Sequence, residues 1–218
     1  DRVISFTVPT GNFGNVFAGL MAKRMGLPID RLVVATNAND ILDRAIKSGR
    51  YEMKGVLATT SPSMDIQVSS NFERLVFLAN NRDAAAVTRA MDSLKQSNAF
   101  TLESAALRAI RNEFDSDATG EATCAATMKS MLAETGELLD PHTAVGVAVA
   151  QKHGGAAPMV TLATAHPAKF PDAVKAATGV TPRLPSRLIH LLKAEERFTI
   201  LPNSAAAVRD YILSRNKA

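Results

Sequence analysis

The first part of the chain alternates between short apolar runs and segments with helical periodicity. Residues 3–8 are β-branched and mostly apolar, which predicts a buried strand, and residues 32–35 predict a second one. Apolar residues then recur at helical spacing over 16–25 and again over 41–46, where Asn39 is placed to cap the helix. This strand–helix–strand–helix order predicts a parallel sheet in an α/β layer.

The middle of the chain has mainly helical periodicity. Ser70 and Glu73 have the spacing of a capping box, with Ser70 as the cap, in front of an apolar helix face. Further amphipathic helices are predicted over 84–94, 103–114 and 119–134.

In the last part of the chain, predicted helices and a predicted strand again follow one another. Asp140 directly precedes Pro141, a pair typical of a capped helix start. Residues 158–163 predict a strand, and residues 167–178 and 203–214 predict helices. The whole pattern predicts an α/β fold with an open, mostly parallel sheet flanked by helices and accompanied by extra helices.

Composition and charge narrow the class of protein. The 218 residues are 46% hydrophobic and 21% charged, which suits a globular domain, and no apolar run is long enough to span a membrane. The net charge is +4, but Lys and Arg are scattered and aromatic residues make up only 5%, so we expect anionic small ligands and no nucleic acid. A single cysteine, Cys124, excludes an intramolecular disulfide and fits a reducing compartment, so we expect a cytoplasmic protein.

The segment Val-Pro-Thr-Gly-Asn-Phe-Gly-Asn at 8–15 joins a predicted strand to a predicted helix. Gly11 and Gly14 allow an oxyanion to approach the backbone, and the helix that follows offers free N–H groups to a phosphate. The alternative is a tight turn that binds nothing. Neither the P-loop nor the dinucleotide-binding pattern is present, which disfavours a free-standing nucleotide site.

Two further segments carry polar side chains in suggestive places. Thr164 follows the predicted strand 158–163, where ligands sit in parallel sheets, and could offer a neutral hydroxyl to a ring nitrogen. His166 could be a base, a phosphate ligand or a side chain that stabilises the turn, and the sequence favours the last.

The hydroxyl-rich segment 59–66 and the nearby Ser69, Asn71 and Arg74 could converge on a second anion. A loop followed by a well-capped helix with a solvated Arg is the alternative that the residues alone favour. The histidines and Cys124 lack the spacing of zinc ligands, so no metal site is predicted.

Four segments in order resemble the threonine synthase family: 8–15, 59–75, 140–146 and 163–170. The resemblance covers nearly the whole chain, and the segment at 59–75 is its most distinctive part. It implies the fold-type-II architecture of enzymes that use pyridoxal 5'-phosphate (PLP), with two α/β domains and the cofactor between them. It also implies conversion of O-phospho-L-homoserine and water to L-threonine and phosphate.

The same resemblance implies roles for individual residues. Around the cofactor phosphate it places Gly11, Asn12, Phe13, Gly14 and Asn15, and at the pyridine nitrogen Thr164. It assigns substrate contacts or support of the site to Ser69, Asn71, Arg74, His142 and Lys169. It implies no metal, and it leaves the oligomeric state open.

A PLP enzyme also needs a lysine that forms a Schiff base with the cofactor. In this family that lysine stands in a Phe-Lys-Asp-like context upstream of the phosphate loop, and no lysine of this chain has such a context. The chain begins at Asp1, about ten residues before the loop. We therefore expect residues 1–218 to be the carboxyl-terminal PLP-binding portion of a longer enzyme. Alone, it should show no turnover, and its first strand should have lost sheet neighbours.

Two other functions stay open. One is a different fold-type-II PLP lyase, similar to threonine dehydratase, against which the segment 59–75 argues. The other is a non-catalytic phosphate-binding module, which the missing lysine would favour.

Overall fold

The computed structural model describes residues 2–216. The chain divides into two compact units, Asp1–Arg183 and Leu184–Ala218. The larger unit contains the sheet and most of the helices, and the two units are described separately.

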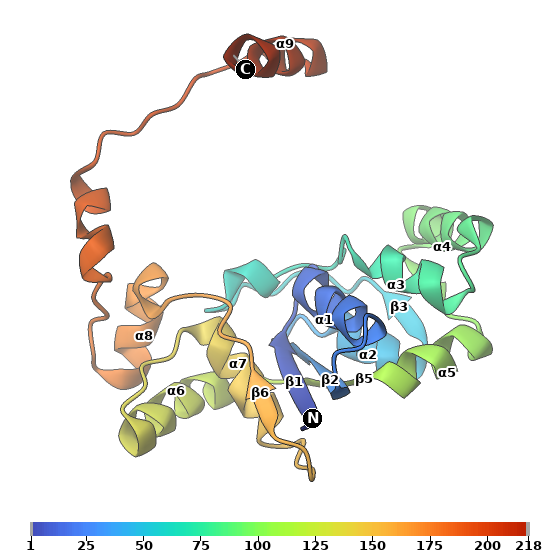
Figure 1. Ribbon diagram of the computed structural model, residues 1–218, viewed down its shortest axis with the longest axis horizontal. Coiled ribbons are helices and arrows are strands. Elements are labelled where there is room, and N and C mark those ends of the chain that lie inside the picture. The colour runs from blue at the N-terminus through green and yellow to red at the C-terminus, as the bar shows by residue number, and fades with distance from the viewer. Residues whose placement is uncertain (1, 217–218) are drawn as a thin grey trace. The chain divides into compact units, whose positions relative to one another are not determined.

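Four parallel strands form the central sheet of the larger unit (Figure 1), in the order β5–β2–β1–β6. They are β1 (Ile4–Pro9), β2 (Ile29–Thr36), β5 (Phe114–Ala118) and β6 (Met159–Thr161). Phe6 of β1 lies opposite Leu32 on one side and Val160 on the other. The predicted parallel sheet is confirmed. The expectation that the first strand has lost sheet neighbours is wrong, because β1 pairs with β2 on one side and with β6, from late in the chain, on the other.

Helices pack on both faces of this sheet. The helices of the larger unit are α1 (Gly14–Arg24), α2 (Ile41–Ser48), α3 (Phe72–Ala79), α4 (Ala84–Ser97), α5 (Ser104–Glu113), α6 (Glu121–Thr135), α7 (Pro141–Ala150) and α8 (Pro171–Thr178). The predicted helices are confirmed, except that the one expected over 167–178 is divided into the short 3-10 helix η2 (Pro167–Lys169) and α8.

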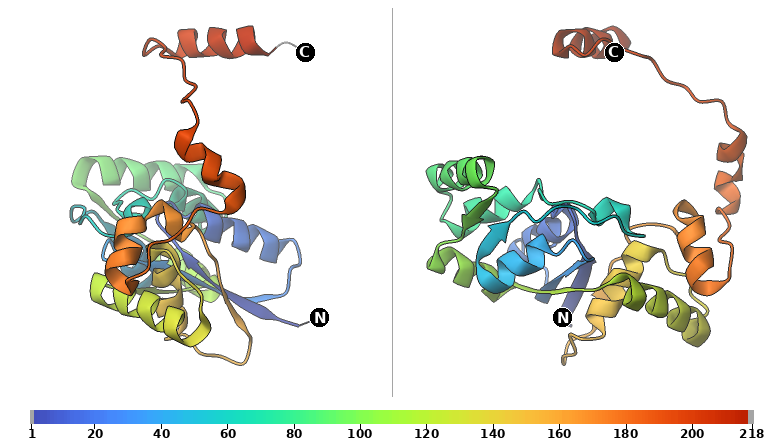
Figure 2. Two further views of the ribbon diagram at one scale, coloured as in Figure 1. Left: turned by 90° about the vertical axis from the view of Figure 1, so that its left-hand side faces the viewer. Right: turned by 180° about the vertical axis from the view of Figure 1, so that it is seen from behind.

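The alternating side chains of β2 define two hydrophobic cores. Leu32 and Val34 pack with residues of α1, α2 and α3. Val33 and Ala35 point to the opposite face and pack with residues of α6, α7 and α8. In the side view of Figure 2, α1 (blue) and α6 (yellow-green) accordingly lie on opposite sides of the strands.

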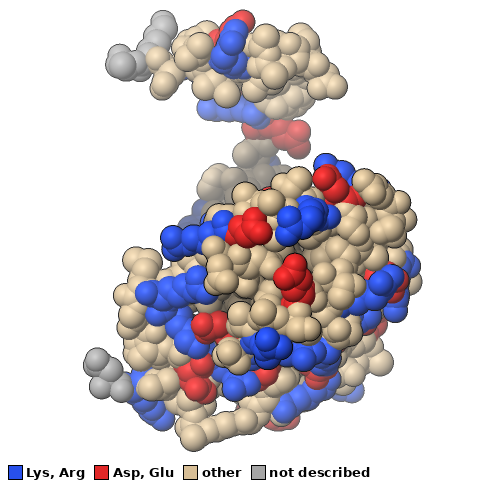
Figure 3. Space-filling view, turned by 90° about the vertical axis from the view of Figure 1, so that its right-hand side faces the viewer, with Lys and Arg blue, Asp and Glu red and all other residues tan. Residues whose placement is uncertain are grey.

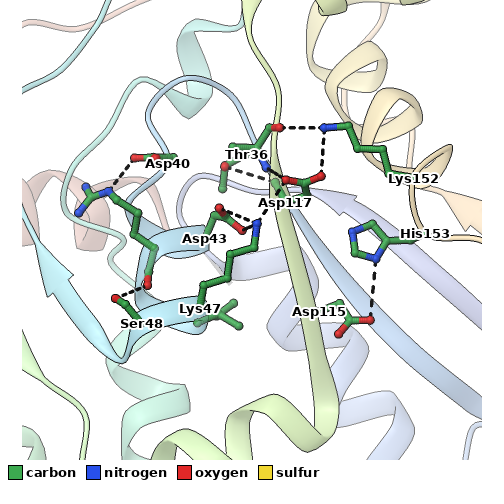
Figure 4. A network of polar contacts seen from close by, with 12 residues as sticks. Thr36, Asp40, Asp43, Lys47, Ser48, Asp115, Asp117, Lys152 and His153 are labelled. Carbon is green, nitrogen blue, oxygen red and sulfur yellow. Dashed lines mark hydrogen bonds and ion pairs between the residues drawn. The ribbon is translucent and has the colours of Figure 1, made fainter.

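The polar strand β5 was not predicted. Its sequence, Phe-Asp-Ser-Asp-Ala, lacks an apolar run, but its acidic side chains are paired with basic ones. Asp115 lies 2.6 Å from Arg31 of β2. Asp117 lies 3.3 Å from Lys47 of α2 and 3.0 Å from Lys152, just after α7. Figure 4 shows that these ion pairs connect β5 to α2 and to the end of α7.

A small antiparallel sheet was missed as well. It pairs β3 (Arg50–Glu52) with β4 (Ala99–Thr101). Tyr51 of β3 stacks on Phe100 of β4 at 4.9 Å and on Phe72 of α3 at 5.3 Å between ring centroids. The small sheet is thereby attached to the main core.

Two of the three predicted helix caps are wrong. The N-cap residue of α2 is Asp40 and not Asn39, whose side chain contacts the segment 57–65 instead. The capping box at Ser70 does not form, because α3 has Asn71 as its N-cap residue and Ser70 hydrogen bonds to Asn12 at 3.3 Å.

The cap of α7 is confirmed. The Asp140 carboxylate accepts hydrogen bonds from the backbone N–H groups of His142 at 2.8 Å and Thr143 at 3.4 Å. Pro141 occupies the first turn, as the sequence predicted.

The smaller unit contains the 3-10 helix η3 (Ser186–Lys193), which was not predicted, and α9 (Ala205–Arg215), which was. The Ser204 hydroxyl caps α9 by accepting a hydrogen bond from the N–H of Ala207 at 3.4 Å. Within residues 2–216, no helix has the length and apolar character needed to cross a membrane.

Candidate functional site

A pocket of about 260 Å³ lies where β1 leads into α1. The loop at residues 9–15 forms one side of it, and six residues of distant segments complete the lining: Ser63, Met64, His142, Thr164, Ala165 and Lys169. The carboxyl ends of parallel strands are the usual ligand sites of such sheets. The structure thus brings the predicted residues Gly11 to Asn15, Thr164, His142 and Lys169 to one pocket.

The loop presents its backbone to this pocket. Phe13 adopts a left-handed conformation with φ of 64°, and its side chain is buried between Phe72 and Phe114, at centroid distances of 5.3 and 5.6 Å. No side chain caps the start of α1, and the N–H groups of residues 11–15 bond to no other residue within 2–216. Free N–H groups at the positive end of a helix dipole suit an oxyanion. The loop therefore fits a phosphate group.

A second segment packs closely against the loop. A Cβ atom at Gly11 would lie 2.8 Å from the carbonyl oxygen of Ser63 and 3.1 Å from Cα of Met64. Both residues belong to the 3-10 helix η1 (Pro62–Met64). Any side chain at position 11 would push this wall away, so the spacing requires glycine.

Ser69 and Asn71 support the loop outside the pocket. The Ser69 hydroxyl donates a hydrogen bond to the carbonyl oxygen of Gly11 at 2.7 Å, and the Asn71 amide donates one to that of Asn12 at 2.9 Å. Ser69 is itself held by the Tyr51 hydroxyl, which accepts a hydrogen bond from its N–H at 2.8 Å.

Arg74 does not line the pocket. Its guanidinium carbon lies 4.3 Å from the ring centroid of Phe17, and Nη1 lies 3.5 Å from the side-chain oxygen of Asn71. The Arg is therefore stacked on α1.

The segment 59–66 is held by a polar network that sequence reasoning missed. The Asp65 carboxylate accepts hydrogen bonds from the N–H of Thr59 at 2.8 Å and from the amides of Asn37 and Asn39 at 2.8 and 2.9 Å. Asn37 and Asn39 are both almost fully buried. Their position just after β2 was the available signal, since polar side chains at that end of a parallel strand often support a site. The hydroxyls of Thr59 and Ser61 take part in the same network, since Thr59 donates to Asp65 and Ser61 accepts from the Asn37 amide.

His142 and Asp140 form a buried pair beside the pocket. Asp140 Oδ1 lies 3.0 Å from Nδ1 of His142, and the Thr143 hydroxyl donates to the other carboxylate oxygen. Burial opposes ionisation of Asp140, but the hydrogen bonds from His142 and Thr143 outweigh it, so the pKa of this carboxyl group lies below its usual value. Asp140 is thus a carboxylate at neutral pH.

Thr164 and Lys169 lie on the exposed side of the pocket. Thr164 contributes a neutral hydroxyl, and Lys169 contributes an ammonium group 5.7 Å from the ring centroid of Phe170. His166 does not line this pocket. Its Nδ1 accepts a hydrogen bond from the N–H of Ala168 at 3.1 Å, which agrees with the turn-stabilising interpretation.

Other chemistry finds less support. Burial raises the pKa of the Cys124 thiol to about 12, so this cysteine is a poor nucleophile at neutral pH. No cluster of three metal-binding side chains occurs within the described part of the chain. Figure 3 shows one face of the larger unit, on which basic and acidic side chains are interspersed. The lining of the pocket thus suits an anionic ligand, since it combines free backbone N–H groups with the Lys169 ammonium group and the Thr164 hydroxyl.

Comparisons with known proteins find similar sequences and structures. The family model "Threonine synthase, C-terminal" matches residues 143–212. The chain is 47% identical to threonine synthase of Pseudomonas aeruginosa, over 97% of the chain and 46% of that protein. A crystal structure of PLP-bound threonine synthase from Brucella melitensis superimposes with a TM-score of 0.89 at 58% identity, over 100% of this chain and 47% of that one. Yeast threonine synthase gives a TM-score of 0.81 at 36% identity, over 97% and 47%. The chain thus spans about half the length of the relatives it matches.

Proposed function

Because the chain belongs to the threonine synthase family, we propose that it forms the side of a threonine synthase active site that holds the PLP phosphate. The observation that carries the proposal is the uncapped start of α1, where residues 11–15 line a pocket and their N–H groups have no hydrogen-bond partner within residues 2–216. A phosphate monoester dianion is the ligand that such a site favours.

The residues of the pocket fit PLP in two places. Gly11 to Asn15 would hold its phosphate through the backbone, and Thr164 would offer its hydroxyl to the pyridine nitrogen. When bound, PLP supplies an electron sink that stabilises negative charge on a substrate carbon. A neutral hydroxyl at the ring nitrogen would not keep that nitrogen protonated as a carboxylate would, so Thr164 tunes how strongly the ring withdraws electrons.

The proposed reaction converts O-phospho-L-homoserine and water to L-threonine and phosphate. Lys169 is the one ammonium group at this pocket within residues 2–216, and it would attract the anionic groups of the substrate. Ser69 and Asn71 would act by holding the loop in place, because both bond to its carbonyl oxygens. Arg74 would act through Asn71, which it contacts.

The lysine that PLP chemistry requires is proposed to come from outside residues 1–218. Lys169 is not suited to replace it, because it lies on the short helix η2 beside Phe170 and belongs to the family motif at 163–170. Residues 1–218 would then be the carboxyl-terminal PLP-binding portion of the enzyme.

The test uses protein expressed from the whole coding sequence, supplied with PLP and O-phospho-L-homoserine. We expect phosphate and threonine in equal amounts. Lys169→Ala should raise KM about tenfold, since it removes one charge-assisted contact to the substrate. Lys175→Ala, on the exposed side of α8, is the matched control and should leave KM unchanged. Deamination of serine or threonine without phosphate release would instead indicate a lyase similar to threonine dehydratase.

A further inference from the structure

His142 combines burial with a place at the pocket. Only 3% of the residue is exposed, although it lines the pocket, and its ring lies 4.6 Å from that of Phe170 between centroids. Both ring nitrogens have partners. Nδ1 lies 3.0 Å from Oδ1 of Asp140, and Nε2 lies 3.2 Å from the backbone nitrogen of Ser63.

These partners determine where the imidazole carries its proton. A backbone N–H can only donate, so Nε2 of His142 must accept from Ser63 and cannot carry a hydrogen. The Asp140 carboxylate can only accept, so Nδ1 must carry the hydrogen. Asp140 cannot turn away, because it also caps α7 and binds the Thr143 hydroxyl. The geometry requires a neutral imidazole protonated on Nδ1.

Ser63, which His142 contacts, packs in turn against the proposed phosphate loop. The carbonyl oxygen of Ser63 lies only 2.8 Å from the position that a Cβ atom at Gly11 would take, so η1 forms a wall directly against the loop. The segment around η1 is anchored at its other end by Asp65. His142 is therefore the connection between the start of α7 and the middle of this wall.

We propose that His142 is a positioning residue, a neutral imidazole protonated on Nδ1 that holds the N–H of Ser63 and thereby fixes η1 against the anion-binding loop. It acts through Ser63 and Gly11 rather than by touching substrate, because neither ring nitrogen is free. The identity of the anion rests on the proposed function, but the tautomer and the contact to Ser63 do not.

The tautomer is measurable in the unaltered protein without PLP. In protein labelled with 15N at histidine, long-range proton–nitrogen correlation reports which ring nitrogens are protonated, and the loss of signals in His142→Gln assigns them. We expect one protonated nitrogen, Nδ1, and a bare Nε2 near neutral pH. A proton on Nε2, alone or together with Nδ1, would overturn the proposal.

Two substitutions of His142 distinguish the contact made by Nε2 from the contact made by Nδ1. The side-chain amide of Asn reaches about as far as Nδ1, whereas that of Gln reaches about as far as Nε2 and can present an oxygen to Ser63. In His142→Asn, hydrogen exchange of the Ser63 amide should become about tenfold faster, the change expected on losing one buried hydrogen bond. The PLP dissociation constant should rise by a similar factor. His142→Gln should stay within about threefold of the unaltered protein in both measurements.

A histidine outside the pocket provides the control for the exchange measurement. His153→Asn, after α7 and beside Asp115, should leave Ser63 exchange unchanged. The proposal fails if His142→Asn keeps full protection of Ser63, or if His142→Gln loses as much protection as His142→Asn. Failure of the unaltered protein to bind PLP would reject the proposed cofactor site, while the exchange and nitrogen measurements would still decide the role of His142. If His142→Asn does not fold, the nitrogen measurement still decides the role of His142, because its assignment uses His142→Gln and not His142→Asn.

Discussion

The proposed anion site depends on the side chains of residues 11–13 staying out of the pocket. Phe13 directs its ring into the core, and Gly11 has no side chain where η1 approaches. At these two positions no side chain lies between the backbone and the pocket, so the N–H groups stay available to a ligand. Side chains contribute mainly by holding that backbone from behind, as Ser69 and Asn71 do.

Gly11→Ala should weaken PLP binding about tenfold or more. The added Cβ would lie 2.8 Å from the carbonyl oxygen of Ser63, so either the loop or η1 must shift, at the cost typical of overpacking. The PLP dissociation constant is measured by absorbance during titration with PLP, in protein expressed from the whole coding sequence. Gly154→Ala is the control, because a Cβ there has open space. Equal PLP affinity in the two variants would contradict the proposed cradle.

Asp140 combines a helix cap with the orientation of His142. Its pKa is lowered in the folded protein, so the ionised carboxylate stabilises the fold above the unfolded pKa of about 3.9. That contribution disappears as the pH falls through the folded pKa.

Asp140→Asn should therefore lower the free energy of unfolding by about 1–3 kcal/mol at pH 7, since a charged acceptor is replaced by a neutral one that still caps the helix. The difference from the unaltered protein should shrink as the pH falls from about 5 to 3. Urea unfolding at several pH values measures both free energies. A difference that does not change with pH would contradict the role of the charge.

Elements with a strong apolar pattern were predictable, and those held by distant partners were not. β1 and β2 are buried on both faces, so their apolar runs identify them. β5 is polar because Arg31, Lys47 and Lys152 neutralise its carboxylates, and these partners are far away in sequence. The support that Asp65 and Asn37 give to the site could not be predicted either, because these partners too are far apart in sequence. The predicted cap at Ser70 does not form: α3 begins one residue later, and the Ser70 hydroxyl donates to Asn12 of the loop at residues 9–15, a partner far away in sequence.

The packing of α7 on the sheet leads to a prediction about Gly146. A Cβ atom there would lie 2.8 Å from Cγ2 of Thr161 and 2.9 Å from Cγ of Pro9, so the helix touches the ends of β6 and β1. Gly146→Ala should lower the free energy of unfolding by about 1–3 kcal/mol, despite the better helix propensity of Ala. Urea denaturation measures the loss. Gly155→Ala, in the connection that follows α7, meets no atom within 4 Å and should be close to neutral.

The chain as a whole covers about half of the relatives it matches, and this limits what it should do alone. It contains the proposed phosphate cradle, because Gly11 to Asn15, Ser63 and Thr164 all lie within it. It contains no lysine that fits the cofactor-attachment context of the family.

Residues 1–218 alone should therefore bind PLP reversibly but release no phosphate from O-phospho-L-homoserine, whereas protein from the whole coding sequence should do both. Phosphate release and threonine formation are measured for the two proteins side by side. Threonine formed by residues 1–218 alone would show that the required lysine lies within them.

The pairing of β1 with β6 also has a consequence for how the protein is made. β1 leaves the ribosome about 150 residues before its partner β6, roughly 8–30 s earlier at ordinary rates of translation. During that interval one edge of an apolar strand has no native partner in the nascent chain. Synthesis of this protein should therefore depend on chaperones that shield the first strand until Met159–Thr161 emerge.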